Sequence, residues 1–251
     1  MAAGYHVLPE IYDRWQKTYG NDYSTLILPK LLATIARFDI PVSTMLDVAC
    51  GTGSLALMMA RRGWKVWGVD ASEEMLAEAE RKFRGKRLPA AFFHQDMRQI
   101  RVPGQVGLAT SMFDSLNHAT SQRELLKAFR GVHRSLLPGG YFVFDTNNEL
   151  CFRSLWTRTD AIHHRDFTII MQNRYIPGRR KAYSFVTVFL RRGEGYARQA
   201  EIVQERFFPR EEVAKLLREA GFRVLEIEDF NFTDMPEIGK IKTWWVAKRE
   251  H

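Results

Sequence analysis

A short apolar run that enters a glycine turn is the feature of this sequence best suited to chemistry. The segment DVACGTG (residues 47–53) joins that run to a helical pattern. Glycine lets backbone approach a ligand closely, and the N–H groups at a helix start favour polar or anionic ligand atoms. Asp70 ends the next apolar run, where a carboxylate can hold both hydroxyls of a ribose. This spacing predicts a cofactor that carries a nucleoside.

The glycine spacing alone also fits a dinucleotide, because GTGSLA (residues 51–56) satisfies the fingerprint G-x-G-x-x-A. Three features favour another nucleoside cofactor. Asp47 precedes the glycines, where it can face a cationic group that a pyrophosphate ligand lacks. Asp96 and Met97 follow the third apolar run and offer a carboxylate and a backbone to an adenine edge. The chain also closes with a helix and two strands instead of a second mononucleotide-binding half.

The elements that position these residues follow from the hydrophobic period. Between residues 44 and 147, short apolar runs alternate with helix-period segments, a pattern typical of βαβ units with a parallel sheet buried on both faces. The strands predicted there cover residues 45–49, 65–69, 91–94, 106–112 and 141–144. The predicted helices cover residues 54–62, 72–83, 122–137 and 210–220, and two last strands cover residues 223–229 and 243–248.

Two further zones differ from this alternating pattern. Residues 1–40 are predicted to be helical, with an aromatic-rich entry, and Pro41 ends that zone. After residue 160 the period becomes two, and turn signals at Pro177-Gly178 and at residues 193–195 separate the runs. The runs at residues 166–176, 182–191 and 198–208 predict a three-stranded antiparallel meander inserted before the last helix.

Composition excludes several classes of protein. The 251 residues include 37 Lys plus Arg and 29 Asp plus Glu, and 45% are hydrophobic, which is an ordinary globular composition. No apolar run reaches the roughly 18 to 20 residues of a membrane span, and the N-terminus lacks a signal-peptide layout, so we expect a cytoplasmic protein without membrane partners. With only Cys50 and Cys151, neither a disulfide framework nor a four-cysteine zinc site is available, and we predict no metal.

Five motifs over residues 45–145 together resemble those of the class I S-adenosylmethionine (SAM)-dependent methyltransferases: DVACGTG, GVDASEEML, HQDM, SMFDSLNH and LLPGG. The resemblance implies an α/β fold with a doubly wound, Rossmann-like, seven-stranded mixed sheet. The last strand of that sheet inserts antiparallel between the fifth and sixth, which fits residues 243–248. The sequence departs from many members at Ala49, where they carry glycine. The implied cofactor is SAM, with S-adenosylhomocysteine as product.

The resemblance also assigns residues to each part of SAM by matching position. The methionine part would be held by Asp47, Ala49, Gly51 and Gly53. Asp70 would take the ribose hydroxyls, with Ala71 and Met75 beside it. Adenine would contact Asp96 and Met97, and the wall behind the sulfonium would consist of Met112, Phe113 and Asn117. A helix cap is the alternative role for Asp96, and core packing is the alternative for Met112 and Phe113.

The run IYDRW (residues 11–15), SMFDSLNH and the meander are similar to small-molecule members of that family, notably the amino-sugar N-methyltransferases. In those enzymes the aromatic N-terminus closes over the cofactor, which makes Tyr12 the predicted lid residue. His118 lies where the family places groups facing the acceptor, and we predict it to be the base or orienting residue, although a lone histidine is more often structural. The expected reaction is in-line transfer of methyl to a small-molecule acceptor, at nitrogen in preference to oxygen. Asp114 and Tyr141 are further polar groups near the expected mouth, and both are interpreted as solvated or structural.

These motifs and period changes divide the chain into four predicted regions. Residues 1–40 form an N-terminal helical lid, and residues 41–160 form the SAM-binding, Rossmann-like core. Residues 161–208 form an inserted antiparallel sheet that covers the substrate, and residues 209–251 supply a helix and the last two strands of the core sheet.

Other readings of the same residues stay open. The meander carries basic residues amid aromatic ones, a mixture that stacks bases and tracks phosphate, so RNA is an alternative acceptor. A solvated basic edge that discourages strand pairing explains the same residues. An NAD-dependent oxidoreductase and a non-catalytic SAM-binding protein are two further alternatives. The oligomeric state also stays open, and a homodimer that pairs through the meander is one possibility.

Overall fold

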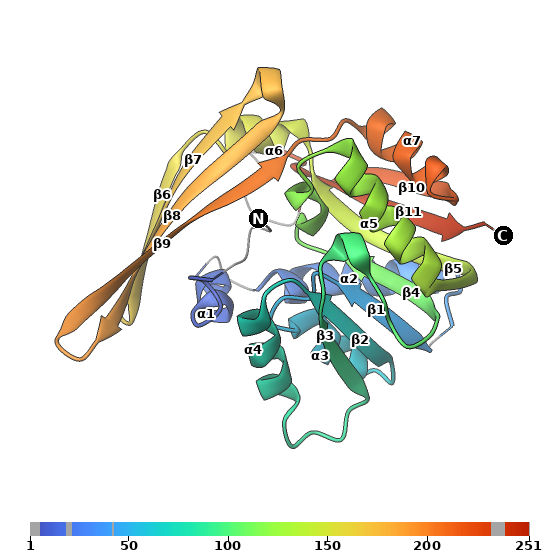
Figure 1. The fold of residues 1–251 in the computed structure, drawn as a ribbon, viewed down its shortest axis with the longest axis horizontal. Coiled ribbons are helices and arrows are strands. Elements are labelled where there is room, and N and C mark those ends of the chain that lie inside the picture. The colour runs from blue at the N-terminus through green and yellow to red at the C-terminus, as the bar shows by residue number, and fades with distance from the viewer. Residues whose placement is uncertain (1–5, 19–21, 42, 232–238, 251) are drawn as a thin grey trace.

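The computed structural model describes residues 6–18, 22–41, 43–231 and 239–250, and these residues form two separate sheets (Figure 1). The larger sheet has seven strands: β1 (Thr44–Val48), β2 (Lys65–Asp70), β3 (Ala90–His94), β4 (Val106–Ser111), β5 (Leu136–Asn147), β10 (Phe222–Phe230) and β11 (Lys242–Arg249). Their order is β10-β11-β5-β4-β1-β2-β3, and β11 runs antiparallel to both of its neighbours. This order confirms the predicted seven-stranded mixed sheet.

Helices cover both faces of the large sheet, as a doubly wound fold requires. On one face, α2 (Tyr23–Arg37) and α3 (Ser54–Ala60) pack against strand residues such as Met45 and Val143. On the other face, α5 (Gln122–Ser135) and α7 (Arg210–Glu219) pack against Leu46 and Phe142. Neighbouring residues of one strand therefore enter different cores, which explains why these strands read as continuous apolar runs.

The second sheet has four antiparallel strands in the order β6-β7-β8-β9. They are β6 (Thr159–His164), β7 (Phe167–Ile176), β8 (Lys181–Arg192) and β9 (Gly195–Arg206), and they lie between α6 (Glu149–Ser154) and α7 in the sequence. Figure 1 shows this sheet as a long ribbon beside the core, with α1 (Tyr12–Lys17) drawn between its lower half and the core. Its inner face buries Phe167 and Val188 against Val7, Ile11 and Met75, and so joins the N-terminal segment to the insertion.

Helix α4 (Glu73–Phe83) is capped, as predicted, by Ser72, whose hydroxyl accepts a hydrogen bond from the Met75 N–H at 3.2 Å. Short 3₁₀ turns cover Met97–Gln99, Ser115–His118 and Pro177–Arg179. Within the described parts of the chain, no helix is both long and apolar enough to cross a membrane.

Several predicted boundaries are wrong. The insertion has a fourth strand, β6, which escaped prediction because its residues alternate between half-buried and exposed and form no apolar face. The helix predicted over residues 122–137 ends at Ser135, and β5 runs well beyond residues 141–144, because Leu136 already pairs with Val106 in the sheet. The N-terminal zone, predicted to be helical, contains the two helices α1 and α2, and its residues 1–5 and 19–21 lie outside the described residues.

Candidate functional site

A narrow cavity of about 60 Å³ lies beside the glycine turn, at the carboxyl ends of β1 and β4. It is lined by six residues that the sequence analysis assigned to the cofactor: Tyr12, Asp47, Ala49, Gly51, Met112 and Phe113. The lining residues that the sequence analysis missed are Gln16, Tyr23, Ser24, Cys50, Thr52, Ser54, Leu55 and Ser115. The fold therefore gathers the first helices, the turn and the loop after β4 around one space.

The turn between β1 and α3 has three residues in the left-handed region, namely Ala49 at φ +56°, Gly51 at φ +53° and Gly53 at φ +71°. Glycine adopts this conformation without strain, whereas a residue with Cβ pays about 1–2 kcal/mol, as Ala49 does. Gly53 is also needed for close packing, because a Cβ there would lie 2.9 Å from the Cβ of Ala79 on α4.

Asp70 is oriented at the end of β2 by backbone amides from two loops. Its Oδ2 accepts from the Gly51 N–H at 2.8 Å and its Oδ1 accepts from the Ser72 N–H at 2.9 Å. Burial raises the pKa of this carboxyl, and the two amides oppose the rise. Ala71 beside it is exposed, whereas Met75 is buried against the N-terminal segment and the second sheet and does not line the cavity.

Asp47 is a buried carboxyl whose pKa lies near neutral pH. Its Oδ1 accepts a hydrogen bond from the Thr110 hydroxyl at 2.8 Å. Burial raises the pKa of Asp47 to about 7, the Thr110 hydroxyl opposes this rise, and the nearby Asp70 charge adds to it. A cation placed beside Asp47 would stabilise its ionised form.

Asp96 and Met97 lie after β3, outside the residues that line the cavity. The Asp96 carboxylate caps the turn by accepting from the Arg98 N–H at 2.8 Å, and both of its oxygens also pair with the Arg98 guanidinium. Burial alone would raise the pKa of Asp96, but the hydrogen bonds from Arg98 outweigh burial and lower it. Arg98 in turn reaches Glu124 on α5 at 2.8 Å, so the helix-cap role weighed for Asp96 is present in the structure.

The loop after β4 holds two consecutive non-glycine residues in the left-handed region, Phe113 at φ +59° and Asp114 at φ +52°. Asp145, fully buried on β5, accepts hydrogen bonds from the N–H groups of both residues at 2.8 Å. It also accepts from the Tyr23 hydroxyl at 2.8 Å and from the Lys242 ammonium at 2.9 Å. One buried carboxylate therefore fixes a strained turn that glycine does not relieve.

Asn117 and His118, at the end of the same loop, both contact strand β9 of the second sheet. The Asn117 amide is fully buried, donates to the Arg206 carbonyl at 2.9 Å and accepts from the Asn147 N–H at 2.9 Å. His118 Nδ1 lies 3.1 Å from the Gln204 carbonyl oxygen. A carbonyl can only accept, so the neutral ring carries its proton on Nδ1 and its lone pair on Nε2. Burial lowers the pKa of His118, while the charge of Asp114 acts to raise it.

The structure adds four polar residues that the sequence analysis missed: Tyr23, Asp145, Glu205 and Lys242. Asp145 ends an apolar run as Asp70 does, but the predicted strand stopped one residue before it. Asp114, interpreted as solvated or structural, is largely buried and pairs with Lys242 Nζ at 2.5 Å. Tyr141 is structural, because its hydroxyl reaches the Phe38 carbonyl at 3.4 Å.

The helix α1 is attached to both the core and the second sheet. Asp13 accepts from the Thr52 hydroxyl at 2.6 Å and pairs with Lys82 of α4 at 2.5 Å. On the other side, Arg14 pairs with Asp166 in the turn between β6 and β7 at 3.0 Å. These contacts hold the Tyr12 ring at the wall of the cavity.

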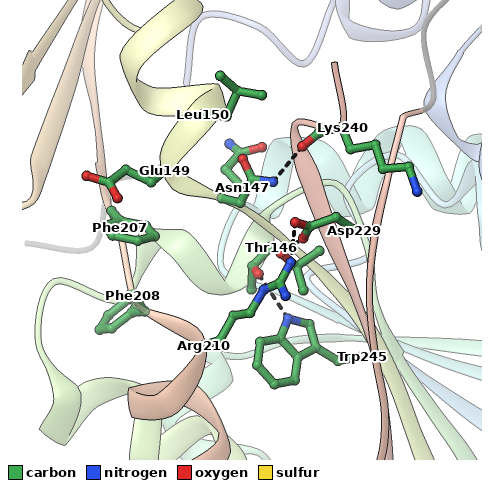
Figure 2. A pocket seen from close by; sticks show the side chains of 12 residues that line it. Thr146, Asn147, Glu149, Leu150, Phe207, Phe208, Arg210, Asp229, Lys240 and Trp245 are labelled. Atoms are coloured by element: carbon green, nitrogen blue, oxygen red, sulfur yellow. Dashed lines mark hydrogen bonds and ion pairs between the residues drawn. The ribbon is translucent and has the colours of Figure 1, made fainter. Parts of the chain in front are cut away.

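A second cavity, of about 440 Å³, lies between α6, α7 and the ends of β5 and β10 (Figure 2). Figure 2 shows the ion pair between Arg210 and Asp229 and the hydrogen bond from Trp245 Nε1 to the Thr146 hydroxyl inside it. None of the predicted site residues lines this cavity. Over the ranges that the structure describes, no group of three or more His, Cys, Asp or Glu side chains is arranged to hold a metal ion.

Comparisons with known proteins agree with this geometry. Residues 45–140 match a family model described as a methyltransferase domain. YqeM of Bacillus subtilis (strain 168), named as a candidate methyltransferase, is 32% identical over 192 residues, which cover 76% of this chain and 77% of YqeM. The dTDP-3-amino-3,4,6-trideoxy-α-D-glucopyranose N,N-dimethyltransferase of Streptomyces venezuelae is 33% identical over 138 residues, covering 54% of this chain and 55% of that protein.

A solved structure extends the likeness to nearly the whole fold. The SAM-dependent methyltransferase from Clostridium acetobutylicum ATCC 824 superposes with a TM-score of 0.84 and 24% sequence identity. The match covers 96% of this chain and 98% of that one, so both sheets and their helices have counterparts there.

Proposed function

Because this chain belongs to the class I SAM-dependent methyltransferases, we propose that it methylates a nitrogen atom on a small-molecule acceptor. SAM supplies an electrophilic methyl group to an in-line attack by the acceptor lone pair. The protein therefore has to align the acceptor, exclude water and take up one proton. The relative from Streptomyces venezuelae is named for N,N-dimethylation of an amino sugar, which supports an amine acceptor for this chain as well.

The residues around the narrow cavity suit the parts of SAM. Asp47 would face the ammonium of the methionine part, because burial raises the pKa of Asp47 to about 7 and a cation there relieves that cost. The turn at Ala49, Gly51 and Gly53 would surround the same part. Asp70, already oriented by two amides, would accept from the ribose hydroxyls.

The other assigned residues play less direct parts in the proposal. Met112, Phe113 and Tyr12 line the cavity. Met112 and Phe113 would form the wall behind the sulfonium, and Tyr12 of the N-terminal lid would cover it. Ala71 and Met97 would offer backbone and side-chain contacts to the nucleoside, with Asp96 fixing that segment through Arg98. Met75 and Asn117 support these segments from buried positions.

The environment of His118 is the observation that favours nitrogen over oxygen as the acceptor atom. Its Nε2 carries the lone pair, and burial lowers the pKa of the ring, which makes the imidazole a weak base. An amine attacks through its own lone pair and needs only a weak base to take its proton, whereas an alcohol needs a stronger one. We therefore propose His118 as the residue that receives the acceptor proton.

The test compares amine acceptors with alcohols of matched shape. The methylated product is detected by mass spectrometry, and the S-adenosylhomocysteine released is measured separately. We expect product from amines, and a kcat lowered by about 100-fold in His118→Gln. Calorimetric SAM affinity should stay unchanged in that variant, which separates proton transfer from cofactor binding. Product from alcohols alone, or full kcat in His118→Gln, would overturn the proposal.

A small molecule is favoured over RNA because two basic residues of the inserted segment, Arg180 and Arg192, already pair with acids of this chain. Arg180 pairs with Glu212 at 3.1 Å, and Arg192 pairs with Glu10 at 2.6 Å. Strong RNA binding that weakens steeply with salt would support the RNA alternative instead.

A further inference from the structure

Five ionisable side chains meet where the second sheet contacts the loop after β4: Asp114, His118, Asp145, Glu205 and Lys242. Lys242 Nζ lies 2.5 Å from Asp114 Oδ1 and 2.9 Å from Asp145 Oδ1. Glu205, only 2% exposed on β9, accepts from the Asn147 amide at 3.1 Å. Glu205 is also hydrogen-bonded to Asp114. The group thus joins the inserted sheet to the core.

A hydrogen bond between two carboxyl groups requires that one of them hold a proton. Burial acts to raise the pKa of both groups, but Lys242, the hydrogen bond with Glu205 and the nearby His118 together more than offset it at Asp114, whose pKa is lowered. At Glu205 the Asp114 charge adds to burial, and the pKa is raised well above its usual value. Glu205 is therefore the protonated partner, and it donates to the Asp114 carboxylate.

His118 is held against this pair by two adjacent residues of β9. Its Nδ1 faces the Gln204 carbonyl at 3.1 Å, and its Nε2 lies 4.0 Å from Glu205 Oε1. The charged groups that act on the ring are the carboxylates of Asp114 and Asp70. A positive charge that forms on the imidazole is therefore stabilised by the Asp114 and Asp70 carboxylates, although Asp114 also pairs with Lys242, in a site that is largely closed to water.

We propose that Asp114 and Glu205 are positioning residues for methyl transfer, with Asp114 as the counter-charge of the His118 imidazolium and Glu205 as the donor that fixes Asp114. The inference rests on the proposed function. As the acceptor lone pair forms the N–CH₃ bond, the S–CH₃ electron pair stays on sulfur, and the acceptor proton moves to His118 Nε2. The inserted sheet thereby supplies part of the proton-handling group in addition to covering the substrate.

The test uses two amide variants that differ in charge. Asp114→Asn removes a carboxylate, so at pH values near the His118 pKa the fraction of imidazolium in an NMR titration should fall about tenfold. Glu205→Gln keeps a neutral donor and should leave that titration unchanged. Asp39→Asn is the matched control, because Asp39 has a similar φ of +50° but is exposed before β1. This titration needs no methyl acceptor, so its outcome is independent of whether amines are the substrates.

Kinetics provide the second readout. In Asp114→Asn we expect kcat about tenfold lower, with its acid limb displaced to lower pH and SAM affinity unchanged. Glu205→Ala should lower kcat, and Glu205→Gln should restore it. The inference is overturned if Asp114→Asn leaves the pKa of His118 unchanged. It is also overturned if Glu205→Gln lowers the pKa of His118 as much as Asp114→Asn does. Should Asp114→Asn fail to fold, equal kcat in Glu205→Ala and wild type would overturn it.

Discussion

The glycine turn at residues 49–53 and the loop at residues 112–118 place similar backbone conformations on two sides of one cavity. In the first, Gly51 and Gly53 adopt positive φ without strain because they have no Cβ, and Ala49 is the one residue with a Cβ that also adopts positive φ there. In the second, Phe113 and Asp114 adopt positive φ at φ +59° and +52° despite their side chains. The first conformation is encoded by residues within the turn, and the second is imposed by residues far away in the sequence.

The difference lies in what offsets the strain. Left-handed conformations at residues with Cβ cost of the order of 1–3 kcal/mol each. At the second loop the compensation comes from Asp145, which accepts four hydrogen bonds, two of them from the strained backbone itself. Lys242 then pairs with both Asp145 and Asp114 and offsets part of their negative charge. The conformation of the glycine turn therefore depends mainly on its own residues. The conformation of the second loop depends on a hydrogen-bond network whose partners come from α2, β5 and β11.

Removing Lys242 is the largest test of that dependence. Lys242→Met leaves two buried carboxylates without their cation, and we expect a loss of about 3–5 kcal/mol in the free energy of unfolding by urea. Lys240→Met is the matched control, because Lys240 is exposed two residues away and should change stability by less than about 0.5 kcal/mol. Equal stability of the two variants would show that the loop holds its conformation without the network.

The second test concerns Asp47, whose pKa of about 7 in the folded protein lies above its ordinary value of 3.8. As pH rises from about 4 to 7, the unfolded chain loses this proton while the native state keeps it, so stability falls over that window. Between pH 5 and pH 8 the wild type should lose roughly 2–3 kcal/mol more than Asp47→Asn. Parallel urea-unfolding curves for the two proteins at both pH values would contradict the assignment.

The smallest expected effect is the difference in stability between two alanine substitutions in the glycine turn. Gly53→Ala combines φ +71° with a Cβ 2.9 Å from Ala79, whereas Gly51→Ala has φ +53° and no atom within 4 Å of its Cβ. We expect about 2–4 kcal/mol lost for Gly53→Ala and about 1–2 kcal/mol for Gly51→Ala, measured by urea unfolding. If Gly51→Ala were the more damaging change, packing against α4 would not be what demands glycine at position 53.

Much of the fold could be predicted because its signals are local. The alternation of apolar runs and helical segments predicted five core strands, and the seven-stranded sheet confirms them with shifted ends. β6 was missed because it lacks an apolar face, and α6 was missed because its six residues make fewer than two helical turns. The end of β5 was missed because pairing with β11, which comes about a hundred residues later, extends it to Asn147.

The candidate site divides in the same way. Asp47 and Asp70 could be selected because Asp47 precedes the glycine turn inside its strand and Asp70 ends the next apolar run, about twenty residues on. Met75 and Asn117 were assigned by motif position alone, and the structure buries both of them away from the cavity lining, so their cofactor roles remain predictions. Nothing in the neighbouring sequence marked Glu205 or Lys242 as a site residue. Glu205 is a polar residue in a strand that alternates polar and apolar residues, and Lys242 begins a strand.

The sequence by itself determined the hydrophobic period, the glycine turn and the acids at strand ends, because these depend on the conformational freedom and burial of neighbouring residues. Only the tertiary structure decided that Asp145, Lys242 and Glu205 would surround the loop after β4. The physical reason is that a buried charge is stable only beside its partners. Those partners come from strands that the chain brings together only on folding.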